Sequence, residues 1–351
     1  MSLDFLQRYG ARRLTVYAPP PPPEQEEEDE SQTGESIHLD LEMPEHSWRA
    51  IATGNELPYD DELPRRFVDG SYFGENVAWL QDVLGRPVPV RLAEIGGICM
   101  CADGRTLRRE AAVVERVVAS LLDPFPWDEV EAFGSALQQD RLQLLCLQPQ
   151  RDEPGSSLDF ERRELSFDFR RNSEAVRLGV LRAMADLEAA ALEHRSDMPT
   201  IVDGPLGRLF GATAPEWDVI GVVKRQVGDY LHPHGYVTML GLQPGDRTPA
   251  FEITSRHLKV ISWYLKLAGG DGEMPDWGYI RVEVPTESIG RHNMSYINRL
   301  SRYLLEIRCR RNRYARGPVS LEPIVRAEES IQALFEPLNP LKQHFWRLVG
   351  I

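Results

Sequence analysis

Two short apolar segments of this 351-residue chain end in the dipeptide Asp-Gly, the first at Asp69-Gly70 and the second at Asp203-Gly204. A β-branched run that stops at Asp-Gly is typical of a buried strand that carries a carboxylate to the edge of a sheet. Asp-Gly is also a common turn dipeptide, so a plain turn remains the alternative for either segment taken alone.

A third acidic residue lies on the helix predicted between these strands, over residues 173–194. Its apolar residues recur at spacings of three and four, at Val176, Val180, Met184, Leu187 and Ala191. Because side chains two positions apart point about 200° apart on a helix, only one of Asp186 and Glu188 can face the sheet. Glu188 lies beside the apolar stripe, which favours it as the inward group.

Three carboxylates held close together repel one another unless a cation neutralises them. Carboxylate oxygens suit Mg²⁺ or Mn²⁺ better than Zn²⁺. Two such ions about 3.5–4 Å apart can activate water and stabilise a leaving oxygen in phosphodiester cleavage. The residues therefore predict a metal site for this chemistry at Asp69, Glu188 and Asp203.

The composition is that of a globular protein, with 42% hydrophobic and 27% charged residues. No apolar run approaches the roughly 18 residues that span a bilayer, and the first residues lack the form of a secretion signal. The four cysteines show no disulfide-scaffold or zinc spacing. We therefore expect a cytoplasmic protein with no membrane partner.

Charge divides the chain into two parts. Residues 1–62 hold fifteen Asp and Glu against four Arg, a net charge of −11, and include five consecutive prolines at 19–23. Such a segment is extended and self-repelling, so we expect residues 1–62 to contain a short helix over 2–17 followed by an acidic, Pro-rich arm or linker. The folded domain is expected over residues 63–351.

The remaining pattern predicts an α/β protein with a mixed sheet flanked by helices. Further strands are expected over residues 66–71, 88–100, 199–203, 217–223, 236–241, 258–267 and 278–284. Helical spacing is expected over residues 106–122, 128–147, 293–313 and 320–335, with 142–147 as an alternative strand.

The order strand-Asp, helix-Glu, strand-Asp, then a ligand on a C-terminal helix is that of the ribonuclease H-like nuclease fold. The chain resembles the NurA nuclease family, over roughly residues 64–335. The resemblance rests on the order of short motifs: Val-Asp-Gly-Ser at 68–71, the Glu188 helix, Ile-Val-Asp-Gly at 201–204, Ile-Gly-Val-Val-Lys at 220–224, Ser-Trp-Tyr-Leu-Lys-Leu at 262–267 and Gly-Tyr-Ile-Arg-Val-Glu-Val-Pro at 278–285.

The resemblance implies that Asp69, Glu188 and Asp203 are catalytic metal ligands for Mn²⁺ or Mg²⁺. The family usually ends its site with an Ala-His pair on the final helix, but this chain has Ala327-Glu328. Glu328 is therefore either a fourth catalytic carboxylate and metal ligand or an exposed helix residue. The tyrosine expected shortly before this pair is also absent.

Two groups of basic residues are candidates for contact with DNA. Lys224 follows an apolar run. Its ammonium group either contacts the scissile phosphate in a catalytic role or is simply solvated at the end of the strand. Residues 291–316 hold eight arginines and one acid, Glu306. Such a surface suits a phosphate backbone, and its tyrosines can stack on bases; the alternative is a helix whose arginines pair with nearby acids. The nucleic-acid candidates are Arg299, Arg302, Arg308, Arg310, Arg311 and Arg313.

The resemblance implies a metal-dependent deoxyribonuclease with 5′–3′ exonuclease and single-strand endonuclease activity. It further implies a homodimer that works with a HerA-type hexameric ATPase in DNA end resection and double-strand break repair. The alternative is a degenerate nuclease fold that acts as an adaptor for DNA or the motor ATPase. A third possibility, an actin-like phosphotransferase, requires two glycine-rich phosphate hairpins, which the sequence lacks.

Overall fold

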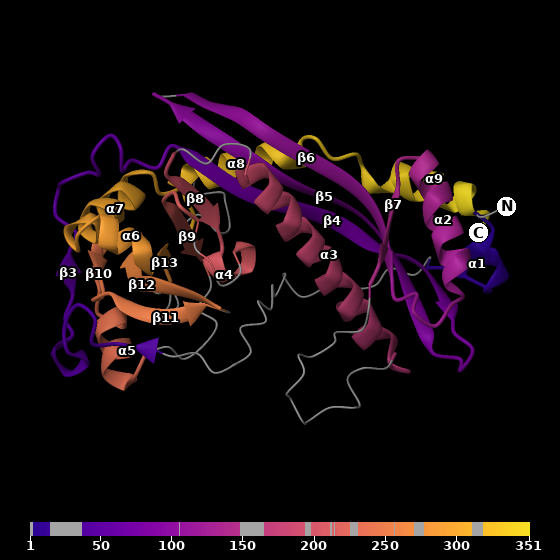
Figure 1. Ribbon diagram of the computed structural model, residues 1–351, viewed down its shortest axis with the longest axis horizontal. Helices are drawn as coiled ribbons and strands as arrows, with labels where there is room; N and C mark the ends of the chain where they lie inside the picture. Colours follow the sequence, from indigo (N-terminus) through magenta and orange to yellow (C-terminus); the bar gives the residue numbers. More distant parts are fainter. Residues whose placement is uncertain are drawn as a thin grey trace.

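A single mixed sheet organises the chain, with helices on both of its faces (Figure 1). The molecule is a computed structural model. The structure describes residues 3–14, 37–104, 106–147, 165–193, 198–210, 213, 215–224, 231–255, 257–269, 277–310 and 319–351.

The described strands follow the order β2-β11-β12-β13-β9-β8-β4-β5-β6-β7. The β4–β8, β8–β9 and β6–β7 pairs are parallel and the other neighbours in this order are antiparallel. The expected α/β class with a mixed sheet is confirmed. The strands are β2 (Ile37–His38), β4 (Arg66–Gln81), β5 (Pro87–Asp103), β6 (Thr106–Ser120), β7 (Gln143–Cys146), β8 (Thr200–Asp203), β9 (Val219–Val223), β11 (Phe251–Ser255), β12 (Leu258–Lys266) and β13 (Tyr279–Pro285), with β1 (Arg12–Arg13), β3 (Ile51–Ala52) and β10 (Asp246–Arg247) paired at the side.

The helices vary from one turn to 25 residues. The long helix α3 crosses β4 and β5, and all five of its predicted stripe residues are buried. In the described residues no helix combines the length and hydropathy needed to cross a membrane. The helices are α1 (Phe5–Arg8), α2 (Trp127–Gln139), α3 (Phe169–Glu193), α4 (Leu206–Leu209), α5 (Pro233–Leu240), α6 (Thr286–Arg291), α7 (Ser295–Glu306), α8 (Glu322–Gln332) and α9 (Leu338–Val349), with a 3₁₀ turn at Glu45–Ser47.

Successive side chains of β4 point to opposite faces of the sheet and belong to two different parts of the hydrophobic core. Val68 packs on the side of α3, in a cluster with Ala191 and Leu192. Its neighbour Phe67 packs on the opposite side, in a cluster that includes residues of α7 and α8. Because successive strand residues point to opposite faces, Asp69 lies on the α7/α8 face and Gly70 on the α3 face.

The prediction of a helix over residues 106–122 is wrong, because this segment is strand β6. It pairs with β5 along its whole length. Val113, Val114, Val117 and Val118 fit helical spacing, but β-branched side chains lose rotamer freedom in a helix and pack well on a pleated sheet. The long antiparallel pairing with β5 therefore decides the structure.

Two smaller predictions also fail. The strand predicted over residues 236–241 is instead the end of helix α5, which stops at Leu240 with Gly241 as its C-cap, because Pro233 at the first helical position favours a helix start. The N-terminal helix spans only Phe5–Arg8, and the chain then forms β1. The strands predicted over 199–203, 258–267 and 278–284 are confirmed by β8, β12 and β13.

Described parts of the first 62 residues pack into the body. Phe5 is fully buried and stacks on Phe133 of α2, with ring centroids 5.1 Å apart. Leu39 and Trp48 are buried in a cluster that includes Met239 of α5 and Phe251 of β11. The five prolines and the acidic run that follows them lie outside the described residues.

Helix α3 approaches the sheet closely at a pair of glycines. Gly70 of β4 and Gly97 of β5 are cross-strand partners. A Cβ atom at residue 97 would lie 2.4 Å from the carbonyl oxygen of Leu187 and 2.6 Å from the amide nitrogen of Glu188. Glycine at this position therefore lets the helix backbone rest directly on the sheet.

We predict that Gly97→Ala destabilises the protein by about 2 kcal/mol or more, because the new methyl group meets helix backbone that cannot rotate away. Urea unfolding measures this change. Gly290→Ala in α6 is the matched control, since a Cβ there has no neighbour within 4 Å. The control is expected to be neutral or more stable by up to about 1 kcal/mol. Equal stability of the two variants would contradict the close approach.

Candidate functional site

The two Asp-Gly segments lie side by side in the sheet. β4 and β8 are parallel neighbours, with Val68 opposite Val202, so Asp69 and Asp203 are adjacent at the point where β8 ends. Both side chains point toward the α7/α8 face. The sequence expectation that two strands deliver carboxylates to one place is confirmed for this pair.

The carboxyl group of Asp69 is the electrostatic centre of the region. Burial raises the pKa of Asp69 well above its usual range, and the charge of Asp203 raises it further. Lys224 lowers this pKa, whereas the charges of Glu188 and Glu328 raise it. The charges of the four other predicted catalytic side chains therefore act on Asp69, although the five residues come from separate segments of the chain.

Lys224 follows β9 and neutralises part of this charge. Its Nζ donates to Oδ2 of Asp203 over 2.7 Å. Because β9 is the parallel neighbour of β8, both residues stand at the same end of adjacent strands. The lysine thus lies within the acidic group, with its side chain only 11% exposed.

Glu188 reaches the region from the α3 face. It is 2% exposed, whereas Asp186 on the same helix is exposed, as the helical phase predicts. A Cβ atom at Gly70 would lie 2.1 Å from Oε1 of Glu188. Because Gly70 has no side chain, the carboxylate of Glu188 can occupy this space.

Arg208 is a member of the site that sequence reasoning missed. This residue of α4 donates through Nη2 to Oε2 of Glu188 and, over 2.9 Å, to the carbonyl oxygen of Asp203. A Cβ atom at Gly204 would meet the same nitrogen at 3.4 Å. The sequence feature that could have predicted this position is Pro205, because a helical turn that starts after Asp-Gly-Pro brings Arg208 back over Gly204.

Glu328 lies on α8, a helix that contacts β4. It is half-buried, and its Oε1 accepts from Nε2 of Gln332 over 3.2 Å. The same nitrogen contacts Oγ of Ser71, also at 3.2 Å. The helix is thus tied to β4 two residues beyond Asp69, on the face to which Asp69 points.

The acidic side chains fit a hard divalent cation in their chemistry, because they offer carboxylate oxygens. Within the described ranges, however, no three His, Cys, Asp or Glu side chains are grouped closely enough to hold one ion. Strand alternation explains this arrangement, since Asp69 and Asp203 lie on one face of the sheet while Glu188 approaches from the other.

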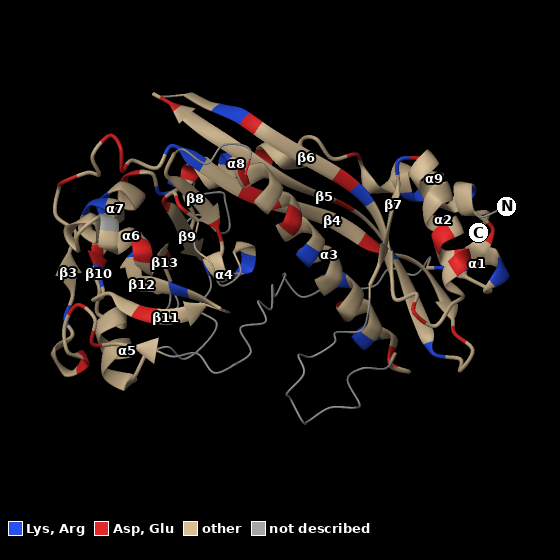
Figure 2. Ribbon diagram, in the orientation of Figure 1, with Lys and Arg blue, Asp and Glu red and all other residues tan. Residues whose placement is uncertain are grey.

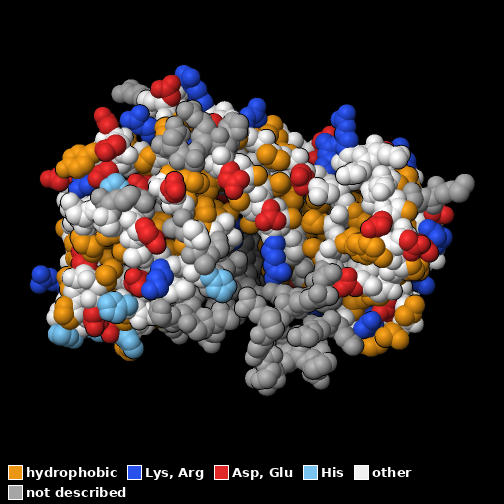
Figure 3. Space-filling model, in the orientation of Figure 1, with side chains coloured by type: hydrophobic (Ala, Val, Ile, Leu, Met, Phe, Trp, Pro, Cys, Tyr) orange, Lys and Arg blue, Asp and Glu red, His pale blue; other side chains and the backbone are white. Residues whose placement is uncertain are grey.

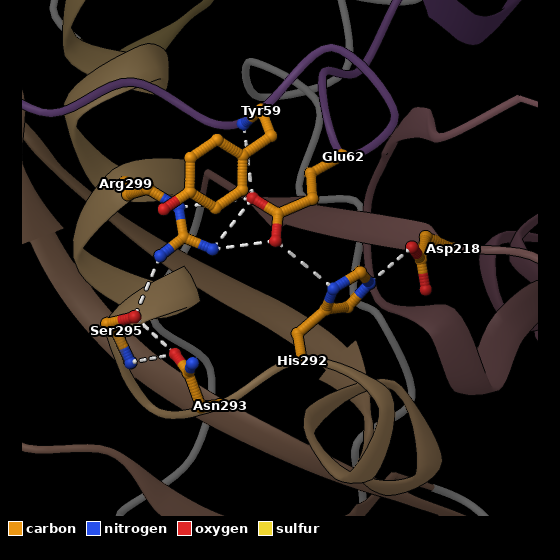
Figure 4. A network of polar contacts seen from close by, with 7 residues as sticks. All are labelled: Tyr59, Glu62, Asp218, His292, Asn293, Ser295 and Arg299. Atoms are coloured by element: carbon orange, nitrogen blue, oxygen red, sulfur yellow. Dashed lines mark hydrogen bonds and ion pairs between the residues drawn. The ribbon is translucent and has the colours of Figure 1, made fainter.

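The expectation that Arg299 contacts nucleic acid does not fit its position. Its side chain is 5% exposed and makes bonds of 2.6 and 2.7 Å to the carboxylate of Glu62 (Figure 4). Glu62 also lies 3.3 Å from Nδ1 of His292, whose Nε2 is 2.7 Å from Asp218. This network joins the segment before β4 to α6, α7 and the start of β9, so Arg299 has a structural role.

Other predicted arginines form a smaller basic group at the end of α7. Burial lowers the pKa of Arg308, and the nearby charges of Arg310 and Arg302 lower it too, partly offset by Glu306. Arg302 pairs with Glu306, whereas Arg310 is exposed. Arg311 and Arg313 lie outside the described residues.

The two tyrosines of this region that the structure describes, Tyr296 and Tyr303, are buried and partly buried, respectively. Tyr296 is 1% exposed, and the hydroxyl of Tyr303 donates to the carbonyl oxygen of Pro64 over 2.8 Å. Burial raises the pKa of Tyr303 to about 12. Acidic and basic residues are interspersed over the described elements in Figure 2 and on the face seen in Figure 3.

We predict that Asp69→Asn raises the melting temperature of the metal-free protein by about 2 °C or more. The amide can still accept the 2.8 Å bond from the backbone N–H of Gly70, while the buried charge is removed. Calorimetry in EDTA measures this gain.

The gain should increase as the pH rises above 3.8, the ordinary aspartate value. The folded parent holds its Asp69 proton to higher pH than the unfolded chain, so the parent loses stability as the pH rises through the raised pKa. Asp186→Asn, on the exposed face of α3, should show no such trend. A melting temperature that falls in Asp69→Asn would contradict the repulsion.

A solved nuclease structure is similar to this chain over most of its length. No family model matches the chain, and no curated protein matches it. Among solved structures, the crystal structure of the NurA nuclease from Sulfolobus solfataricus aligns with 13% sequence identity and a TM-score of 0.38, covering 86% of each chain.

Proposed function

We propose that this protein is a metal-dependent nuclease that hydrolyses phosphodiester bonds in DNA. The observation that carries the proposal is the adjacency of Asp69 and Asp203 on the parallel strands β4 and β8, with Nζ of Lys224 2.7 Å from Asp203 and the carboxylate of Glu188 beside Gly70. A buried acidic group of this kind raises the free energy of the metal-free protein, which is typical of a site that serves function rather than stability.

Asp69 and Asp203 would hold the cation, Mn²⁺ or Mg²⁺, with Glu188 and Glu328 as the further carboxylates. A cation bound there would supply Lewis-acid activation of water and stabilisation of the leaving oxygen. Lys224, whose Nζ lies 2.7 Å from Oδ2 of Asp203, would donate to a phosphate oxygen of the substrate. Glu328 cannot serve as a neutral imidazole base, so proton removal would fall to a carboxylate.

The substrate class is proposed from the basic group at the end of α7 and from the sequence motifs. Arg302, Arg308 and Arg310 would contact the phosphate backbone, whose negative charge they would neutralise.

Finer properties are proposed from the sequence resemblance to the NurA family alone. They comprise a ribonuclease H-like core, 5′–3′ exonuclease and single-strand endonuclease activity, and a homodimer. They also include a HerA-type hexameric ATPase as partner, and a cytoplasmic role in DNA end resection and double-strand break repair.

An adaptor that has lost catalysis is the second candidate. The pairing of Glu188 with Arg208 and of Asp203 with Lys224 favours it, because basic side chains already contact two of the carboxylates. The Ala327-Glu328 pair, where the family usually has Ala-His, favours it as well. An adaptor would bind DNA or the motor ATPase without cleaving DNA.

Digestion of end-labelled single- and double-stranded DNA in Mn²⁺ tests the proposal. We expect cleavage by the parent protein and a loss of at least about 100-fold in Asp69→Asn, because an amide is a poor ligand for a hard cation. Asp186→Asn should retain the parent rate. Equal cleavage by all three proteins would indicate contamination, and no cleavage by the parent, alone or with the motor ATPase, would favour the adaptor.

We further predict that Arg308→Ala and Arg310→Ala weaken DNA binding in a salt-dependent way. The slope of log affinity against log salt concentration should fall by about 0.7–0.9 for each phosphate that the variant no longer neutralises. Arg347→Ala, which removes an exposed arginine of α9, is the matched control. Unchanged slopes in both Arg308→Ala and Arg310→Ala would place the DNA-binding surface elsewhere.

A further inference from the structure

We propose that Arg208 is a positioning residue that holds Glu188 until a divalent cation replaces it, so that the arginine and the cation compete for one carboxylate. This inference rests on the proposed function, because it concerns the same site. It adds a residue that the sequence motifs do not include.

The contacts of Arg208 place it between the two Asp-Gly segments. Nη2 bonds the Glu188 carboxylate on one side and the Asp203 carbonyl oxygen on the other. Glu188 in turn lies over the backbone of Gly70. The arginine thus holds Glu188 on the α3 face of the sheet. Asp69 and Asp203 lie at the same level of the strands but point to the α7/α8 face.

Burial makes this contact strong enough to compete. The Glu188 side chain is 3% exposed and the Arg208 side chain 21%. Loss of a cationic partner from a buried carboxylate is costly, so we expect this ion pair to stabilise the metal-free protein. Conversely, a cation that binds Glu188 must first break its ion pair with Arg208. The affinity of the protein for the cation is therefore lower by the factor by which the ion pair favours the arginine-bound state.

The displaced guanidinium would remain beside Asp203 and Gly204. Arginine binds phosphate through paired hydrogen bonds, and the more exposed position of Arg208 leaves it accessible from solvent. When the cation binds Glu188, Arg208 would therefore be released to bind a phosphate of the substrate backbone. Substrate contact by Arg208 would then depend on whether the cation is bound.

The test is Mn²⁺ titration by calorimetry on the full-length protein without DNA, for the parent, Arg208→Ala and Arg208→Lys. We expect Arg208→Ala to bind Mn²⁺ about 5-fold tighter or more, and Arg208→Lys to lie between the two. In EDTA, Arg208→Ala should melt below the parent, and saturating Mn²⁺ should reduce that difference. Arg326→Ala, an exposed arginine of α8, is the control.

Two further measurements separate competition from a merely structural role. In a Glu188→Gln background, Arg208→Ala should no longer change Mn²⁺ affinity, because the shared carboxylate is gone. With the wild-type glutamate, Arg208→Ala should cleave DNA more slowly despite its tighter Mn²⁺ binding.

The outcomes distinguish this inference from the proposed function. If the parent binds Mn²⁺ and cleaves DNA but Arg208→Ala binds Mn²⁺ equally or more weakly, the competition is refuted and the nuclease stands. If Arg208→Ala binds tighter and also cleaves faster, the phosphate contact is refuted. If the parent neither binds Mn²⁺ nor cleaves DNA, both proposals fail.

Discussion

The direct contact between the backbone of α3 and the β4–β5 pair sets the geometry of everything near Asp69. A helix normally rests on a layer of side chains, but at Gly97 its backbone meets the sheet without one. This closeness brings Glu188 down to the level of the strands, where Gly70 has no side chain to exclude it. The glycines therefore matter as much to the acidic group as the carboxylates, because they allow charged oxygens to be buried beside one another.

The sheet distributes the charges between its two faces, and basic residues accompany each set. Lys224 pairs with Asp203 on the face covered by α7 and α8, while Arg208 pairs with Glu188 on the face covered by α3. Asp69 remains the group whose pKa is raised by burial and by its acidic neighbours. A protein selected for stability alone would replace such a residue, since a buried like-charge group opposes folding.

Much of this site could be predicted from sequence because its signals are local. A β-branched run ending in Asp-Gly and a helical stripe beside Glu188 depend on neighbouring residues only. The failures involve long-range contacts. Segment 106–122 is a strand because β5 pairs with it, and Arg299 is buried because Glu62, far away in the sequence, binds it. Arg208 was missed because its partners come together only when α3 packs on the sheet.

The length of β4 has a consequence for the accuracy of folding. Its 16 residues pair with β5 from Arg66 to Gln81, with one bulge near Asn76. A slip of one residue would exchange the faces of Asp69 and Gly70 and press the aspartate against the helix. The extended pairing makes such a slip costly along the whole ribbon, so the long hairpin secures the register of a two-residue motif.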